Sequence, residues 1–176
     1  MAHKNQQIFC KKIKEKFPKY FENITVLDVG SLDVNGNNRY LFENCYYYGI
    51  DVVDGPNVNI VTVAHYFNPP IQYNTIISTN ALEHDMYWKL TIKRMYDLLL
   101  SDGLLLISCA SKWKEHGTLN TNPHASGTAQ REDVWANYYK NLTIEDITEN
   151  FKLDLMFSKY NIEVNKKDLQ FWGIKK

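Results

Sequence analysis

Five short apolar segments constrain the fold of this sequence more than any other feature does. They lie at 24–29, 46–50, 59–63, 75–78 and 104–109. Each is short enough to be a buried parallel strand, and apolar residues at helical spacing occur over 6–17 and 87–100. Two more strand-like segments, 153–164 and 169–174, flank a turn at 165–168. We therefore expect an α/β fold with a doubly wound, Rossmann-like, seven-stranded and mostly parallel sheet that ends in an antiparallel β-hairpin.

The composition favours one folded unit and excludes some classes of protein. The 176 residues are 44% hydrophobic and 23% charged, unlike a disordered chain. No internal repeat or flexible linker interrupts them, so we expect a single domain over 1–176, with a helical N-terminal leader over 1–22. Twenty basic residues balance twenty acidic ones, so the net charge does not indicate a nucleic-acid partner.

Cysteine usage and the lack of long apolar runs indicate a cytoplasmic protein. Cys10, Cys45 and Cys109 are too scattered for a disulfide framework, and none of them has metal-ligand spacing. The longest apolar run, 98–107, is interrupted by polar residues, so we expect no segment to span a membrane. We therefore expect reduced thiols, a cytoplasmic location and no membrane partner.

The turn after the first expected strand carries a candidate ligand site. It reads Asp28-Val29-Gly30-Ser31. Such a turn places backbone N–H groups and a carboxylate at the carboxyl edge of the sheet, where ligands of doubly wound folds bind. The second strand ends at Asp51, and an acid at that place can accept hydrogen bonds from both hydroxyls of a ribose.

With these motifs in this order, the chain resembles the class I S-adenosylmethionine-dependent methyltransferases (methyltransferase type 11-like) from residue 26 onward. Further shared features are the segment Asn80-Ala81-Leu82-Glu83-His84, the Ser-Asp-Gly sequence at 101–103 and the terminal hairpin. The resemblance implies S-adenosyl-L-methionine as cofactor, with Gly30 near its methionine part, Asp28 at its amino end and Asp51 at its ribose. The implied cofactor-binding residues are Asp28, Gly30, Ser31, Asp51, Val52, Ala64 and Asn80.

Two positions depart from the pattern of that family. Leu32 stands where a second glycine usually follows Gly30, and Val63 stands where a polar residue often contacts adenine. The nearest rival is a nicotinamide-binding Rossmann domain. That domain expects Gly-x-Gly-x-x-Gly, which residues 30–35 do not provide.

Methyl transfer to a hydroxyl requires a group that removes the hydroxyl proton. A sulfonium methyl is already activated, so the protein mainly aligns the acceptor and excludes water. A general base or a metal ion then assists a hydroxyl acceptor. Glu83, His84 and His116 are the catalytic candidates, because they follow strands four and five at one edge of the sheet. Two alternatives for His84 stay open. It acts as a base or orients the acceptor without a metal ion, or it only packs at the rim of the pocket.

The same three residues resemble the divalent-metal site of certain O-methyltransferases. Those enzymes act on the terminal ribose 2′-hydroxyl of small RNAs or on polyprenylated catechols, and carry a Glu-x-x-Glu-His segment after strand four. Here Asn80 replaces the first Glu, so a Mg²⁺ site formed by Glu83, His84 and His116 lacks one charged ligand. The resemblance leaves Mg²⁺ as an alternative.

The long polar segment 111–136 is the expected lid and acceptor-binding surface. It offers hydroxyls, amides, Trp113, Trp135 and Arg131, which suit a polar small-molecule acceptor. A basic N-terminal helix could recruit nucleic acid, although a solvated helix face is the commoner explanation. We expect O-methylation of a small polar or sugar-like acceptor. The alternatives are an RNA or other nucleic-acid methyltransferase and a catalytically inactive, methyltransferase-like binding module.

Overall fold

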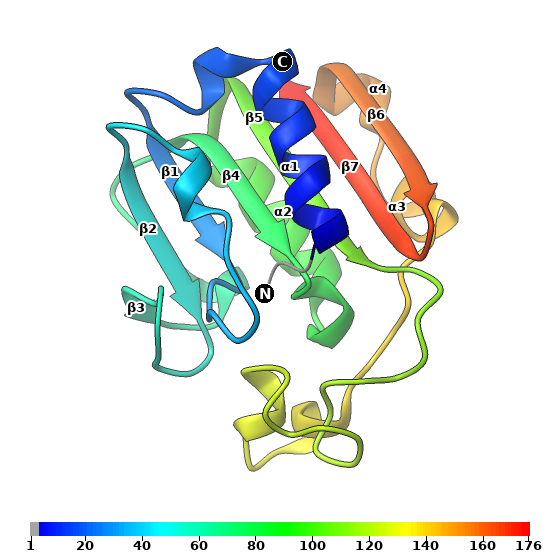
Figure 1. Cartoon of the computed structure of the whole chain (residues 1–176). Coiled ribbons are helices and arrows are strands. Elements are labelled where there is room, and N and C mark those ends of the chain that lie inside the picture. Colours follow the sequence, from blue (N-terminus) through cyan, green and yellow to red (C-terminus); the bar gives the residue numbers. More distant parts are fainter. Residues whose placement is uncertain (1–3) are drawn as a thin grey trace.

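The computed structural model describes residues 4–176, whose strands form one seven-stranded sheet in the order β3-β2-β1-β4-β5-β7-β6 (Figure 1). The pairs among β1 to β5 are parallel, and β7 inserts antiparallel between β5 and β6. The expected mostly parallel sheet with a C-terminal antiparallel hairpin is confirmed. The strands are β1 (Thr25–Val29), β2 (Tyr46–Asp51), β3 (Ile60–Val61), β4 (Tyr73–Thr79), β5 (Leu99–Ala110), β6 (Phe157–Asn165) and β7 (Asp168–Lys175).

Helices cover both faces of this sheet, because successive strand side chains point to opposite faces. The helices are α1 (Lys4–Lys16), α2 (Trp88–Leu98), α3 (Ile144–Asn150) and α4 (Leu153–Met156). α1 crosses the front face in Figure 1, where Phe9 belongs to the same apolar cluster as Leu106. α2 lies behind the sheet, where Ile92 shares a cluster with Leu105. No helix within residues 4–176 is long and apolar enough to cross a membrane.

The connections from β1 to β4 contain no α-helix among the described residues. The sequence also predicts a short helical segment over 39–43, and the structure has a single 3-10 turn at Arg39–Leu41. Just before it, Asp33 accepts hydrogen bonds from the backbone N–H of Gly36 and the side chain of Asn37, which form a turn over 33–37. The 3-10 helices are η1 (Pro18–Tyr20), η2 (Arg39–Leu41), η3 (Ala64–Tyr66), η4 (Leu82–His84), η5 (Thr128–Gln130) and η6 (Val134–Asn137).

Two element boundaries differ from the sequence-based expectation. The strand expected over 153–164 begins with α4 and becomes extended only at Phe157. The Asp102-Gly103 pair after the helical pattern of 87–100 predicts a helix end at that pair. The helix α2 already ends at Leu98, and β5 continues through the pair. The pairing of β5 with β4 shifts register there, and Asp102 has a positive φ of 60°. The pair therefore forms an irregularity inside a strand rather than a helix end.

The segment 111–136 lies beyond the carboxyl edge of the sheet, at the bottom of Figure 1. Its later part is closed into a loop, because the backbone N–H of Leu119 donates to the carbonyl of Ala136 at 2.9 Å. The chain that follows it is fixed to the sheet edge, where the backbone N–H of Lys140 donates to the carbonyl of Glu83 at 2.8 Å. The segment therefore covers the edge at which ligands of such folds bind.

Candidate functional site

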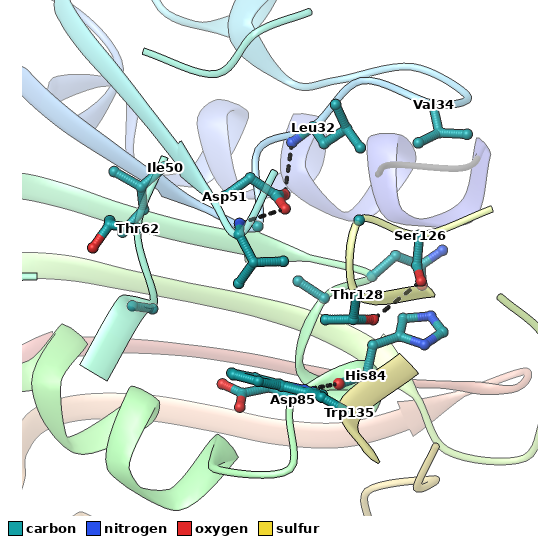
Figure 2. A pocket seen from close by; sticks show the side chains of 16 residues that line it. Leu32, Val34, Ile50, Asp51, Thr62, His84, Asp85, Ser126, Thr128 and Trp135 are labelled. Carbon is teal, nitrogen blue, oxygen red and sulfur yellow. Dashed lines mark hydrogen bonds between the residues drawn. The ribbon is translucent and has the colours of Figure 1, made fainter. Parts of the chain in front are cut away.

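A cavity lies where the carboxyl ends of β1, β2 and β4 meet. The chain runs from β1 to one side of the sheet and returns to β4 on the other, so this is the topological switch point at which open α/β sheets bind ligands. The cavity contains about 550 Å³ of space, its open mouth included. Its walls are formed by Gly30, Leu32, Val34, Ile50, Asp51, Val52, Thr62, Ala64, Asn80, Ala81, His84, Asp85, Ser126, Gly127, Thr128 and Trp135 (Figure 2).

Gly30 brings the turn after β1 against the segment after β4. Its φ is 76°, in the left-handed region that favours glycine, and a Cβ at this position would lie 2.1 Å from the Cβ of Ala81. The backbone N–H groups of Gly30 and Ser31 both donate to the carbonyl of Ile50, at 2.9 and 3.0 Å. The turn is therefore held to the end of β2 with no side chain between it and Ala81.

Asp51 ends β2, and Figure 2 shows its carboxyl group hydrogen bonded within the cavity. Its Oδ2 accepts a hydrogen bond from the backbone N–H of Leu32 at 3.0 Å, and its Oδ1 accepts one from that of Val52 at 2.7 Å. Burial raises the pKa of this carboxyl, and the two backbone bonds oppose that rise. A carboxylate oxygen can accept more than one hydrogen bond, so Asp51 retains capacity for ligand hydroxyls.

Five of the expected cofactor residues line this cavity, namely Gly30, Asp51, Val52, Ala64 and Asn80. Asp28 and Ser31 are buried and do not line it.

Asp28 and Ser31 support the turn from behind. The carboxylate of Asp28 accepts hydrogen bonds from the hydroxyl of Tyr47 at 2.6 Å and from the side-chain amide of Asn57 at 3.1 Å. The same amide donates to the carbonyl of Ser31 at 2.9 Å. A direct contact of Asp28 or Ser31 with the cofactor stays a prediction, and their hydrogen bonds show that they hold the turn after β1 in place.

Asn80 is held by two different elements. Its φ is 52°, and its backbone N–H donates to the carbonyl of Ser108 in β5 at 2.8 Å. Its side-chain Oδ1 accepts a hydrogen bond from the amide of Gln6, which lies fully buried in α1. The first helix therefore belongs to the structural support of the cavity.

The long loop forms the outer wall of the same cavity. Gly127 packs on Asp51 so closely that a Cβ would lie 2.4 Å from Asp51 Oδ1. Nearer the end of the loop, the indole Nε1 of Trp135 donates to the carbonyl of His84 at 2.6 Å, as Figure 2 shows. The loop thus contacts both the expected ribose-binding acid and the expected catalytic histidine.

Glu83, His84 and His116 come together beside this cavity. One ligand-type atom from each of the three lies within 4.8 Å of the others. The rings of His84 and His116 are 5.6 Å apart, and both contact the ring of Tyr139. Of the three, only His84 lines the cavity itself. Their proximity agrees with the sequence analysis, and their catalytic and metal-binding roles stay predictions.

The two cluster residues in η4 are buried with unpartnered polar atoms. Neither carboxylate oxygen of Glu83 nor Nδ1 of His84 has a hydrogen-bond partner. Burial raises the pKa of Glu83 to about 7. Burial, followed by the nearby charge of His116, lowers the pKa of His84 to about 3. Buried polar atoms without partners are rare in folded proteins and are typical of a catalytic group or a ligand site.

Comparison with known proteins identifies the fold. No protein-family model and no curated protein matches the sequence. A 1,6-didemethyltoxoflavin-N1-methyltransferase from Burkholderia thailandensis, solved with S-adenosylhomocysteine, is similar in structure with a TM-score of 0.65 and 12% identity over 96% of this chain and 77% of that one. An S-adenosylmethionine-dependent methyltransferase from Clostridium acetobutylicum has a TM-score of 0.63 and 12% identity over 100% and 93% of the two chains.

A third similar structure is a magnesium protoporphyrin IX methyltransferase from Synechocystis, solved with S-adenosylmethionine. Its TM-score is 0.62 at 12% identity, over 98% of this chain and 80% of that one. Likeness at such low identity is likeness of fold. The chain therefore has the fold of the class I S-adenosylmethionine-dependent methyltransferases, as the sequence motifs indicated.

Several residues that line or support the cavity have no signal in the sequence. Thr62 contributes to its wall, next to Val63, the position at which the family pattern often has a polar residue and this chain does not. Gln6 reaches Asn80 from a helix 74 positions earlier. Ser126, Gly127 and Thr128 lie in a polar loop without periodicity. Among these three loop residues, Gly127 is the local signal in the sequence for a close contact.

Proposed function

We propose that this protein is an S-adenosyl-L-methionine-dependent methyltransferase that methylates a hydroxyl of a small polar or sugar-like acceptor. The observation that carries the proposal is that Asp51 and His84 line one cavity at the switch point of the sheet. This supports the proposal that Asp51 binds the ribose and that His84 acts on the acceptor within one ligand site. The similar structures solved with S-adenosylmethionine or S-adenosylhomocysteine support the choice of cofactor.

The residues around the cavity fit this cofactor. Gly30 lines the cavity with its backbone while the turn packs on Ala81, and the methionine part of the cofactor would lie next to that backbone. Asp51 accepts hydrogen bonds from the ribose hydroxyls, each of which contributes about 1.5 to 3 kcal/mol when the acceptor is charged. Val52, Ala64 and Asn80 complete the wall.

The cluster next to the cavity fits a hydroxyl acceptor. The cofactor supplies an activated methyl group, which is transferred to the acceptor oxygen by direct displacement. Glu83 does not line the cavity, so it would take up the hydroxyl proton by way of the neighbouring His84 or His116. Its pKa of about 7 lies near neutral pH, where a general base is most effective. His84 is uncharged at that pH, so it can orient the acceptor through a hydrogen bond.

The same cluster also suits a divalent metal ion. Two imidazoles and one carboxylate favour a transition metal such as Mn²⁺ or Zn²⁺, whereas Mg²⁺ prefers oxygen ligands. The unpartnered oxygens of Glu83 and Nδ1 of His84 have the chemistry of metal ligands. We therefore propose Glu83, His84 and His116 as the ligands, and a bound ion there would increase the acidity of the acceptor hydroxyl.

Isothermal titration of S-adenosylhomocysteine into the protein tests the cofactor site. We expect binding that Asp51→Asn weakens about tenfold or more, because one charge and one acceptor are lost. The control is Asp54→Asn, which removes the same charge three residues later at an exposed position that does not line the cavity. If S-adenosylhomocysteine does not bind at about millimolar concentration, the proposed enzymatic function is wrong and the alternative of a catalytically inactive binding module is left.

The acceptor class needs an activity measurement. Incubation with S-adenosylmethionine and matched acceptors, such as a sugar, its amino-sugar analogue and a short RNA, separates the alternatives by the mass of the product. Methylation of the sugar hydroxyl supports the proposal. Methylation confined to the amine or to the RNA contradicts it.

A further inference from the structure

A second hollow adjoins the cavity on the side of His116. Residues on its wall include Asn35, Asn80, Trp113, Lys114, His116 and Lys167, and we call it the acceptor groove. Asn80 lines both the cavity and the groove. His116 belongs to the cluster with Glu83 and His84. An acceptor in the groove therefore has the cluster at its inner end, beside the cofactor cavity.

Hydrogen bonds and a cation–π contact hold the outer wall of the groove in place. The indole Nε1 of Trp113 donates to Asp168 Oδ1 at 2.8 Å, and the carbonyl of Trp113 accepts a hydrogen bond from the side chain of Asn141 at 2.8 Å. The ammonium group of Lys167 lies 5.0 Å from the centre of the Trp113 ring. The carbonyl of Lys167 accepts hydrogen bonds from the backbone N–H groups of 111–112 at 2.8 and 3.0 Å. The Lys167 cation is thus positioned through both its side chain and its backbone.

The two lysines on this wall have no ion-pair partner among residues 4–176. Both Lys114 and Lys167 are exposed. Glu115 also lines the groove, and its Oε1 accepts a hydrogen bond from a threonine hydroxyl at 3.0 Å. Asp168 is buried beneath the indole of Trp113. Two further exposed lysines belong to the same two turns, namely Lys112 and Lys166.

We propose that Lys114 and Lys167 form an anion subsite, which binds a phosphate or carboxylate carried by the methyl acceptor. The inference deepens the proposed function and rests on it, since it names the acceptor as an anionic one whose hydroxyl reaches the cluster at His116. A lysine ammonium group binds a phosphate or carboxylate as a point charge with three hydrogen-bond donors. An anionic group of an acceptor in the groove would therefore pair with Lys114 and Lys167. A neutral sugar would leave both cations unmatched.

Matched acceptor pairs that differ only in charge test the subsite. We propose NMR titrations of the full chain, with and without S-adenosylhomocysteine, using ribose 5-phosphate against ribose and glucuronate against glucose. We expect at least one anion to bind about tenfold more tightly than its neutral partner, and this preference to decrease as salt is added. The two pairs distinguish a phosphate from a carboxylate.

Variants connect that preference to the two lysines. Lys114→Gln with Lys167→Gln should reduce the preference to near unity, whereas Lys159→Gln, which removes an exposed charge at the start of β6, should leave it unchanged. Equal binding within both pairs, absence of any binding by the anions, or a preference that survives the double variant would overturn the proposal. S-adenosylhomocysteine binding in the same samples reports on the proposed function separately, because neither lysine lines the cofactor cavity.

Discussion

Gly127 of the long loop packs directly on the carboxyl group of Asp51, so that a Cβ at residue 127 would lie 2.4 Å from Asp51 Oδ1 and 3.0 Å from Val53 Cγ2. The φ of Gly127 is −66°, a value that any residue adopts. Space, and not backbone conformation, therefore requires glycine here. The contact makes the loop, which we propose as an acceptor surface, part of the expected ribose site as well.

Gly127→Ala should move the loop away from Asp51. We expect the added methyl group to lower the free energy of unfolding by about 1 to 3 kcal/mol and to weaken S-adenosylhomocysteine binding, because overpacking forces neighbouring groups to shift. Thermal unfolding and calorimetric titration measure the two effects. In an Asp51→Ala background most of the overlap disappears, so the same substitution should then have a smaller effect on stability. Equal effects in both backgrounds would contradict the contact.

Gln6→Ala should damage the cofactor site from a distance. Gln6 is fully buried and donates to Asn80 Oδ1, so its removal leaves a partly buried acceptor without this donor. Such a loss is expected to lower the free energy of unfolding by about 1 to 3 kcal/mol and to weaken cofactor binding through Asn80. Lys11→Ala is the control, since Lys11 is exposed on the same helix. Unchanged affinity in Gln6→Ala, with only stability reduced, would limit α1 to a structural role.

These two contacts show where the sequence stops being informative. Periodicity located the strands, and adjacent parallel strands end at one edge of a sheet, so Glu83, His84 and His116 could be predicted to lie together. Gln6 and Gly127 reach the same site from a helix and a loop whose local patterns contain no information about a distant partner. The same limit explains α4, where local hydrogen bonds to the carbonyl of Lys152 replace the first part of an expected strand.

Glu83→Gln should change how stability depends on pH. Burial raises the pKa of Glu83 from 4.5 to about 7, so the folded protein retains a proton that the unfolded chain releases. The stability that this proton contributes is present below pH 4.5 and is lost as pH rises through about 7, by up to about 3 kcal/mol. His84 acts in the opposite direction, because its lowered pKa contributes stability above pH 6.5 that is lost as pH falls through about 3.

Gln does not titrate, so in Glu83→Gln the free energy of unfolding still rises with pH because of His84 but is no longer lowered by Glu83. We therefore expect Glu83→Gln to gain stability relative to the unmodified protein between about pH 5 and about pH 8. Thermal unfolding across this range in the presence of a chelator measures the difference, since a bound ion would displace the proton. Parallel pH profiles for the two proteins would show that Glu83 titrates as it does in the unfolded chain.

His116→Ala should abolish a stabilising effect of divalent transition metals. An ion at a hundredfold excess over its Kd stabilises the folded protein by about 2.7 kcal/mol, which raises the Tm by several degrees for a chain of this length. We expect Mn²⁺ or Zn²⁺ to produce this shift in the unmodified protein and a chelator to reverse it. His124→Ala is the control, because His124 is an exposed imidazole of the same loop outside the cluster. Equal shifts in both variants would place the ion elsewhere.

Gly30→Ala should be the most damaging of these substitutions, for two separable reasons. A non-glycine residue at φ 76° costs about 1 to 2 kcal/mol, and the new Cβ overlaps the Cβ of Ala81 at 2.1 Å. In the double variant Gly30→Ala with Ala81→Gly, the Cβ of residue 81 is absent, so the overlap is relieved. The cost of a positive φ at a non-glycine residue 30 stays. We therefore expect a favourable coupling of about 1 to 3 kcal/mol in a double-mutant cycle measured by denaturant unfolding. Additive effects would mean that the turn after β1 and the segment after β4 are not in contact, and the cofactor cavity would then lack the wall that Gly30 and Ala81 form.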